Sequence, residues 1–319
     1  MKYPLFFLPW LVTAALFEWL VVRTLTRLAI FMPKSDLITS IYRSLTSIGN
    51  LASTLSAVLV MAALIWIIWK SFRPDSLHIA ALIWMSALAL NLIFLVLPGV
   101  GVLAVVFQVF MLLAVIVVGW RAISTASESP QKFSILIPVL ALVCGRLYQI
   151  FPLAYEAFGL PGPVLFSGFL FNAGELFVVA SSFILWWTYA RKAPLSSYIM
   201  ALIPVLAFTG LRLMNPSMAG ILSIWSMGLT LYLPWPLYAI SLWLAVVVVL
   251  ANINQDRHVA VAVILLAAGG YAPQLTTQAF YGLVALWCFM LDERWVKNEA
   301  DVDFDNSLQL ERAFNSKMS

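Results

Sequence analysis

Two copies of a short apolar motif each end in an arginine, and these arginines are the first residues in the sequence that could do chemistry. Residues 136–149 read LIPVLALVCGRLYQ and residues 202–215 read LIPVLAFTGLRLMN, so eight of fourteen positions are identical at an offset of 66 residues. Arg146 and Arg212 stand at the same place in both copies. A guanidinium can hold a carboxylate or phosphate through two parallel hydrogen bonds. The repeated arginine therefore predicts a site for an anionic solute or a lipid headgroup, unless each arginine only anchors its helix by reaching the headgroups.

Few other polar side chains interrupt the apolar runs, and they complete the candidate site. Glu175 is the acidic residue that we expect deepest in the membrane, and Asn172 lies about one helical turn before it. Asn91 holds roughly the place of the arginine in a weaker echo of the motif, residues 85–98. Ionisable residues within membrane spans are costly to bury and are candidates for function. The predicted substrate-binding residues, with no catalytic residue or metal ligand among them, are Arg146, Glu175, Arg212, Asn172 and Asn91.

Glu175 needs a partner, because a lone carboxylate in an apolar interior is either paired or held in its neutral form. Arg146 is the first candidate, since it stands on the preceding helix of the same predicted hairpin, and Arg212 is the competing one. Glu18 and Gln108 are further polar residues within predicted spans. An ion pair that only locks two helices together explains the same residues as well as a binding site does.

Membrane helices are the elements that must position these residues. Of the 319 residues, 63% are hydrophobic and only 10% are charged, whereas soluble domains are about half apolar and about a quarter charged. Continuous apolar runs of about 20 residues can each cross the bilayer core as a helix. We therefore expect an all-α, polytopic integral membrane protein with about ten transmembrane helices. The predicted spans are 4–22, 49–69, 77–97, 101–120, 133–153, 164–189, 196–213, 234–252, 259–275 and 277–292.

The charge of the linkers predicts how these spans are oriented. One set of linkers is polar and mostly basic, and the short linkers between them carry almost no charge. Because Lys and Arg favour the cytoplasmic side, we expect successive hairpins with an internal repeat in the plasma membrane, with both termini in the cytoplasm. Residues 1–292 then form the transmembrane domain, and residues 293–319 form a charged, disordered cytoplasmic tail. The basic linkers are 70–78, 121–132, 190–197 and 252–258.

The predicted architecture is typical of a small secondary transporter. Its size and span count resemble those of the drug/metabolite transporter superfamily, a resemblance of size and topology that no sequence motif accompanies. It implies a carrier for a small, anionic or lipid-like solute. The alternatives are a non-catalytic membrane subunit that holds a partner protein through its tail, and a lipid-modifying enzyme without a recognisable motif.

The expected partners are the lipid bilayer, a small solute and a protein partner. The placement of charge argues against nucleic acid, and the placement of histidine argues against haem. The net charge of +4 is spread singly over the ends of apolar runs, which argues against nucleic acid as a partner because nucleic acid needs a basic patch. His78 and His258 are the two histidines, and both fall at predicted helix starts rather than inside the bundle. A haem with two histidine ligands is therefore not expected, and no other cofactor is expected.

One linker conflicts with the charge rule. Residues 23–48 carry four basic side chains, yet the predicted topology places them outside the cell. Either the first apolar run is not a full span, or this segment lies on the membrane surface. The four basic residues are Arg23, Arg27, Lys34 and Arg43.

Thiol labelling of this linker tests the topology. In a chain with Cys144 and Cys288 replaced by serine, we expect Ser35→Cys to react with a membrane-impermeant maleimide in intact cells, because ten spans with cytoplasmic termini place it outside. Reaction only after the cytoplasm is opened would contradict the first predicted hairpin.

Overall fold

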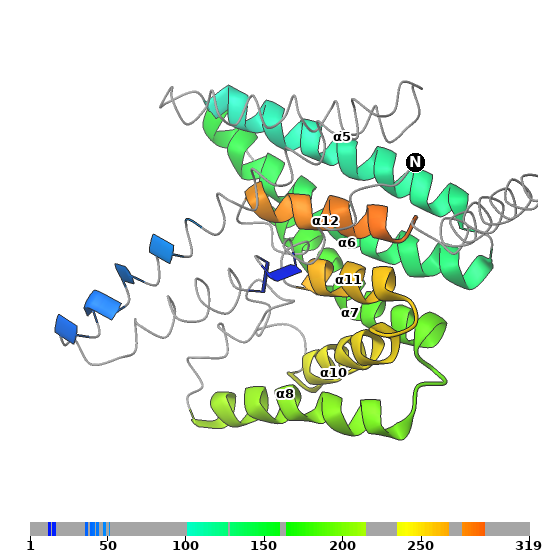
Figure 1. The fold of residues 1–319 in the computed structure, drawn as a ribbon. Coiled ribbons are helices and arrows are strands. Elements are labelled where there is room, and N and C mark those ends of the chain that lie inside the picture. The colour runs from blue at the N-terminus through cyan, green and yellow to red at the C-terminus, as the bar shows by residue number, and fades with distance from the viewer. Residues whose placement is uncertain are drawn as a thin grey trace, which may run out of the picture.

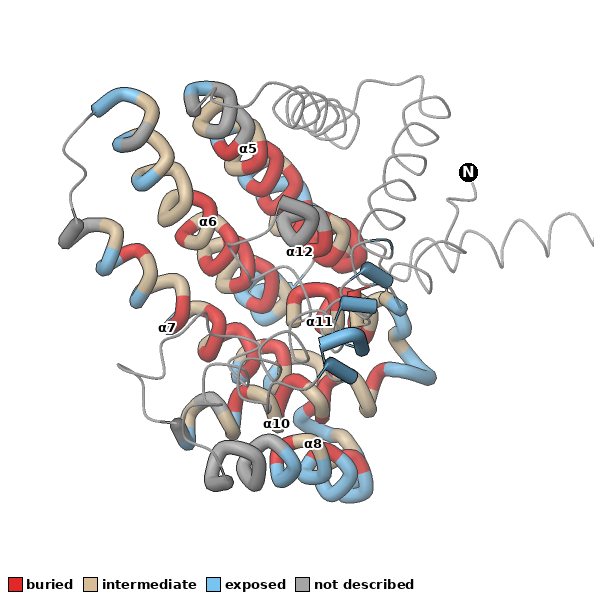
Figure 2. Tube along the Cα trace, turned by 90° about the vertical axis from the view of Figure 1, so that its left-hand side faces the viewer, coloured by how far each residue is buried: buried red, intermediate tan, exposed pale blue. Residues whose placement is uncertain are grey.

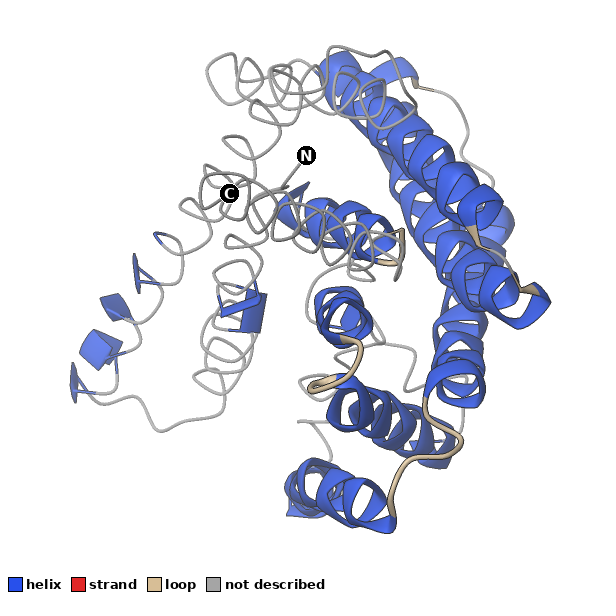
Figure 3. Cartoon of the chain, turned by 45° about the vertical axis from the view of Figure 1, so that its right-hand side comes forward, coloured by secondary structure: helices blue, strands red, loops and turns tan. Residues whose placement is uncertain are grey.

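The computed structural model describes five stretches of the chain, together with single positions between 12 and 51. Every regular element in those stretches is a helix (Figure 1, Figure 3). The described stretches are 101–126, 128–159, 164–214, 235–267 and 276–290. Their helices are α5 (Gly101–Thr125), α6 (Ser129–Phe158), α7 (Val164–Tyr189), α8 (Leu195–Met214), α10 (Trp235–Asn252), α11 (Arg257–Leu265) and α12 (Thr276–Cys288).

Helix bounds follow the predicted spans closely where local signals are strong. The bounds of α7 coincide with the predicted span 164–189. Helix α6 is longer than predicted, since Pro130 suits its first turn, where no N–H is needed. At its other end Gly159 adopts φ 63° and donates its N–H to the Tyr155 carbonyl at 2.8 Å, which closes the helix. Helix α11 is shorter than the predicted span 259–275, whose residues after 267 lie outside the described part.

Three helices in the described stretches are long and apolar enough to cross a membrane. They are the segments Gln108–Thr125 in α5, Ser129–Tyr155 in α6 and Ser167–Tyr189 in α7. Two shorter apolar segments, Leu195–Ala207 and Ala239–Asn252, lie in α8 and α10. These helices indicate a membrane protein.

Several predicted features lie beyond what these helices establish. The total of about ten spans, the repeat of hairpins, the orientation and the plasma-membrane location stay predictions. The predicted spans 4–22, 49–69 and 77–97 and the tail 293–319 are not among the described stretches, apart from a few positions between 12 and 51.

The described helices make a closed series of packing contacts. Helix α6 packs between α5 and α7, α7 packs against α10, and α11 joins α10 to α12, which returns to α5 and α6. Helix α8 packs on α10. Figure 2 shows α5, α6 and α7 side by side, with buried residues on the faces turned toward α11 and α12. The series therefore encloses one interior.

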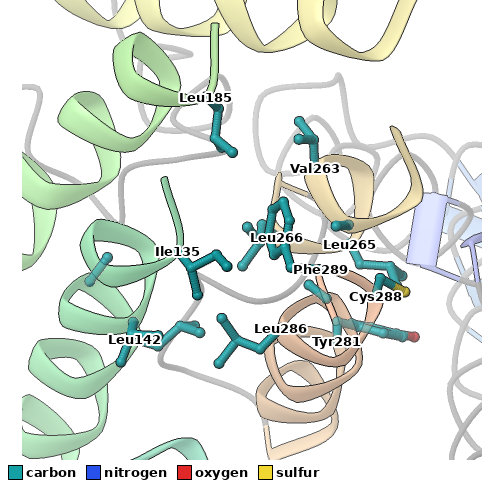
Figure 4. Close-up of a cluster of buried hydrophobic side chains, with 14 of the residues drawn as sticks. Ile135, Leu142, Leu185, Val263, Leu265, Leu266, Tyr281, Leu286, Cys288 and Phe289 are labelled. Atoms are coloured by element: carbon teal, nitrogen blue, oxygen red, sulfur yellow. The ribbon is translucent and has the colours of Figure 1, made fainter. Parts of the chain in front are cut away.

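Apolar side chains fill that interior. Ile135 and Leu142 of α6, Leu185 of α7, Leu266 directly after α11 and Leu286 of α12 point toward one another (Figure 4). Lipid is as apolar as leucine, so shape-matched packing rather than expulsion of water holds such helices together. Large apolar side chains on the outward faces are correspondingly exposed, as a lipid solvent permits.

Three interhelical loops lie at one end of the helices, which we call the basic end. They join α5 to α6, α7 to α8, and α10 to α11. Thr188 donates its hydroxyl hydrogen to the Pro130 carbonyl at 3.5 Å, and the Asn252 side-chain amide donates to the Tyr189 carbonyl at 3.3 Å. These bonds tie the ends of α6, α7 and α10 together.

Small residues set the closest approaches between neighbouring helices. A Cβ atom added to Gly119 of α5 would lie 2.7 Å from Cγ2 of Val139 in α6. A Cβ atom added to Gly174 of α7 would lie 3.3 Å from the Cys144 Cβ. Glycine therefore lets α5 and α7 approach α6 closely, as small residues commonly do in membrane helix pairs.

The Gly119–Val139 contact gives a direct test of this packing. Gly119→Ala should destabilise the protein by about 1–3 kcal/mol, since valine is stiff and the backbones must separate. Thermal unfolding in detergent measures the effect, and Val139→Ala should partly reverse it. Gly168→Ala is the matched control, because nothing lies within 4 Å of its added Cβ. Equal behaviour of Gly119→Ala and Gly168→Ala would contradict the packing of α5 on α6.

Candidate functional site

Arg146 lies inside the helix assembly. Only 2% of its surface is exposed, and it stands about 18 Å from the Phe158 end of α6, near the middle of the helix. Its Nη1 donates to Oε1 of Gln108 in α5 at 3.5 Å. The sequence left open that Arg146 only anchors its helix, with its side chain reaching the headgroups. The longer helix and the burial make it an interior residue instead.

Three polar residues continue the apolar stripes of three neighbouring helices. On α6, Arg146 comes four residues after the buried Leu142 and shares its face of the helix. On α5, Gln108 comes three residues before the buried Met111 and likewise shares its face. On α7, Glu175 is 4% exposed and lies about 17 Å from the start of the helix. We call Gln108, Arg146 and Glu175 the polar layer. The layer lies on the interior side of α5, α6 and α7.

The register of α6 against α7 places Arg146 and Glu175 at similar depth. Gly174 meets Cys144 across this interface. About one turn further along α6, the ring centroids of Tyr148 in α6 and Phe171 in α7 are 5.2 Å apart. Arg146 lies between Cys144 and Tyr148 on α6, and Glu175 directly follows Gly174 on α7. The backbones of Arg146 and Glu175 are therefore about one helical turn apart along the helix axis.

The polar layer has the chemistry of a binding site. A guanidinium carries five donors and a permanent positive charge, a glutamine amide both donates and accepts, and a carboxylate accepts. Together they can hold a carboxylate or phosphate group and balance its charge. Within the described residues, no group of His, Cys, Asp and Glu side chains could hold a metal ion. The chemistry of the layer is therefore suited to recognising an anion.

The other predicted site residues are not brought to this layer by the described residues. Asn172, predicted to share a face with Glu175, is exposed. Arg212 lies in α8, but its side chain is outside the described part, and Asn91 is outside it entirely. The sequence predicted a site shared by the arginines of both motifs. Helix α6 packs on α5, α7 and α12, whereas α8 packs on α10, so the two motif helices are not close neighbours, and a role for Arg212 stays a prediction.

Two of the polar contacts that the sequence did not predict involve helices of the polar layer. Gln108 was only noted as a polar residue, and its bond to Arg146 depends on the packing of α5 against α6. Ser241 of α10 donates to Ser182 of α7 at 2.8 Å between buried hydroxyls. The signal for Gln108 is its spacing, because it is three and seven residues from the buried Met111 and Val115 and therefore shares their helix face.

The chain was compared with known protein families, curated proteins and solved structures. No protein-family model, curated protein or solved structure matches this chain. Function is therefore inferred from the geometry of the polar layer.

A double-mutant cycle tests whether the layer is one unit. Arg146→Gln and Glu175→Gln should each lower stability, because each leaves a buried charge without its balance. The double variant should be less destabilised than the sum of the two, with a coupling of about 0.5–3 kcal/mol.

The control pairs Arg146→Gln with Ser241→Ala, which lies against Ser182, two turns along α7 from Glu175. These two effects should add to within about 0.5 kcal/mol. Additive effects of the Arg146 and Glu175 substitutions, measured by denaturation in mixed micelles, would mean that the two charges do not interact.

Proposed function

We propose that this chain is a small secondary carrier that binds an anionic solute at the polar layer. The observation that supports the proposal most is the buried Arg146 near the middle of an apolar helix. A buried arginine pair seldom adds stability over well-packed apolar residues, because desolvation of the charges offsets their attraction. Intramembrane charges therefore commonly mark substrate or ion pathways.

Each member of the layer has a role in this proposal. The Arg146 guanidinium takes the carboxylate or phosphate of the solute through two hydrogen bonds. The Gln108 amide holds the guanidinium in place and fixes its orientation. The Glu175 carboxylate is the internal counter-ion that balances Arg146 when the site is empty. When the solute takes its place, Glu175 takes up a proton, because a lone carboxylate does not stay charged in an apolar interior. The buried positive charge is thus balanced in both the empty and the loaded state.

The repeated motif also enters the proposal. Carriers are commonly built from repeated units whose interface holds the substrate. Helices α6 and α7 form one candidate unit, and α8 and α10 form the second, with Pro138 and Pro204 at matching places within the motif helices. The two candidate units meet where α7 packs on α10, beside the face of α7 that carries Glu175. Movement at this contact would give the polar layer access to either side.

Anion binding and uptake test the proposal. We expect at least one of phosphate, acetate, succinate, citrate and glutamate to raise the unfolding temperature of the purified chain and to accumulate in proteoliposomes. Arg146→Gln should abolish both effects. Arg146→Lys should weaken binding, because lysine cannot form the two parallel hydrogen bonds of a guanidinium. Arg257→Gln is the control, since Arg257 is exposed at the basic end, and it should leave both effects intact.

The opposite outcome would favour the alternative of a non-transporting membrane subunit. That outcome is a folded wild-type protein that no anion stabilises, that accumulates no solute, and that Glu175→Gln leaves unchanged in every measurement.

A further inference from the structure

The outward side of α6 and α7 carries basic and aromatic residues together at the basic end. Trp187 is 57% exposed and Phe133 is 52% exposed. Lys132 and Arg191 are also exposed. The Arg191 guanidinium carbon lies 5.7 Å from the centroid of the Trp187 ring, a cation–π distance. We call Lys132, Phe133, Trp187 and Arg191 the basic–aromatic patch.

A hydrogen bond brings the two halves of this patch together. Thr188 donates its hydroxyl hydrogen to the Pro130 carbonyl at 3.5 Å, across the junction of α7 with α6. Trp187 adjoins Thr188 in the chain, and Lys132 lies two residues after Pro130. The start of α6 and the end of α7 therefore present their charges at the same level.

The charge at this end favours an anionic partner. Five basic residues lie in or next to the described loops there, against two acidic ones. The basic residues are Arg121, Lys132, Arg191, Lys192 and Arg257, and the acidic ones are Glu128 and Asp256.

An apolar stripe leads away from the patch along α7. Phe169, Leu176, Phe183 and Trp187 are all exposed. Their spacings of seven, seven and four residues place them on one face of the helix. The stripe runs about 27 Å along the helix, and its part from Trp187 to Leu176 is about 17 Å long, roughly one leaflet of a 30 Å core. Because this part begins beside the charges, it fits an amphiphile rather than a water-soluble anion.

We propose that the basic–aromatic patch binds the headgroup of an anionic phospholipid, whose acyl chains lie along the exposed stripe of α7. Lys132 and Arg191 contact the phosphate, and Trp187 holds Arg191 in position while lying at the boundary between headgroups and chains, where tryptophan is favoured. This lipid site shares no residue with the polar layer. The proposal that it binds lipid therefore does not depend on the proposal that the chain transports a solute.

Binding of defined lipids to the full chain tests the site. Native mass spectrometry and thermal unfolding in a neutral detergent compare dioleoylphosphatidylglycerol with dioleoylphosphatidylcholine, which has the same chains. We expect phosphatidylglycerol to bind more tightly and to raise the unfolding temperature. The double variant Lys132→Gln/Arg191→Gln should weaken phosphatidylglycerol binding roughly thirty-fold, since each basic residue near a lipid surface contributes about one kcal/mol.

A matched control removes the same charge from the same end. Arg121→Gln/Arg257→Gln should weaken phosphatidylglycerol binding much less than the patch variant. Equal weakening by both double variants would show a general surface-charge effect and overturn the proposed site. Stabilisation by glycerol 1-phosphate equal to that by phosphatidylglycerol would also overturn it, because a soluble phosphate does not use the apolar stripe.

Discussion

Burial of one guanidinium near the middle of an apolar helix constrains the structure around it. Arg146 cannot face lipid without a large desolvation cost, so α6 must turn this side inward and neighbouring helices must supply polar atoms. Helix α5 supplies Gln108, and α7 carries Glu175 at nearly the same depth. Gly119 lets α5 approach α6 closely, and Gly174 does the same for α7. The close packing brings the polar side chains of α5 and α7 toward Arg146. Among the described residues, the interior on the basic-end side of the layer holds buried serine hydroxyls but no further buried charge.

Side-chain hydrogen bonds join neighbouring helices at the basic end, away from the polar layer. At the basic end, hydrogen bonds through Thr188 and Asn252 join α6, α7 and α10. Ser182 and Ser241 add a buried contact between α7 and α10. The polar layer lies further from these ties, where α6 and α7 touch through small and aromatic residues. In a carrier this arrangement would fix the helices at one end and leave the solute site at the more adjustable part.

Sequence patterns predicted the helices better than the contacts between them. The span 164–189 coincides with α7, since apolar composition and the flanking turns determine where a membrane helix ends. The sequence also identified Arg146 and Glu175 as interior candidates, because charge in an apolar run is informative by itself. It did not pair Arg146 with Gln108, and it placed Asn172 on the face of Glu175 although Asn172 is exposed. Those facts depend on how each helix is rotated and which helix lies beside it, and a single sequence does not encode either one locally.

Water access to the polar layer most directly distinguishes a binding site from a structural charge cluster. Single cysteines at Gln108 and Glu175 would be labelled with a small, water-soluble methanethiosulfonate in lipid nanodiscs, in a chain whose native cysteines are replaced. Met111→Cys and Val178→Cys report on the apolar part of the same two stripes. A binding site predicts that positions 108 and 175 react measurably and that positions 111 and 178 do not. Equal lack of reaction at all four positions would show that the layer is sealed and would contradict a carrier.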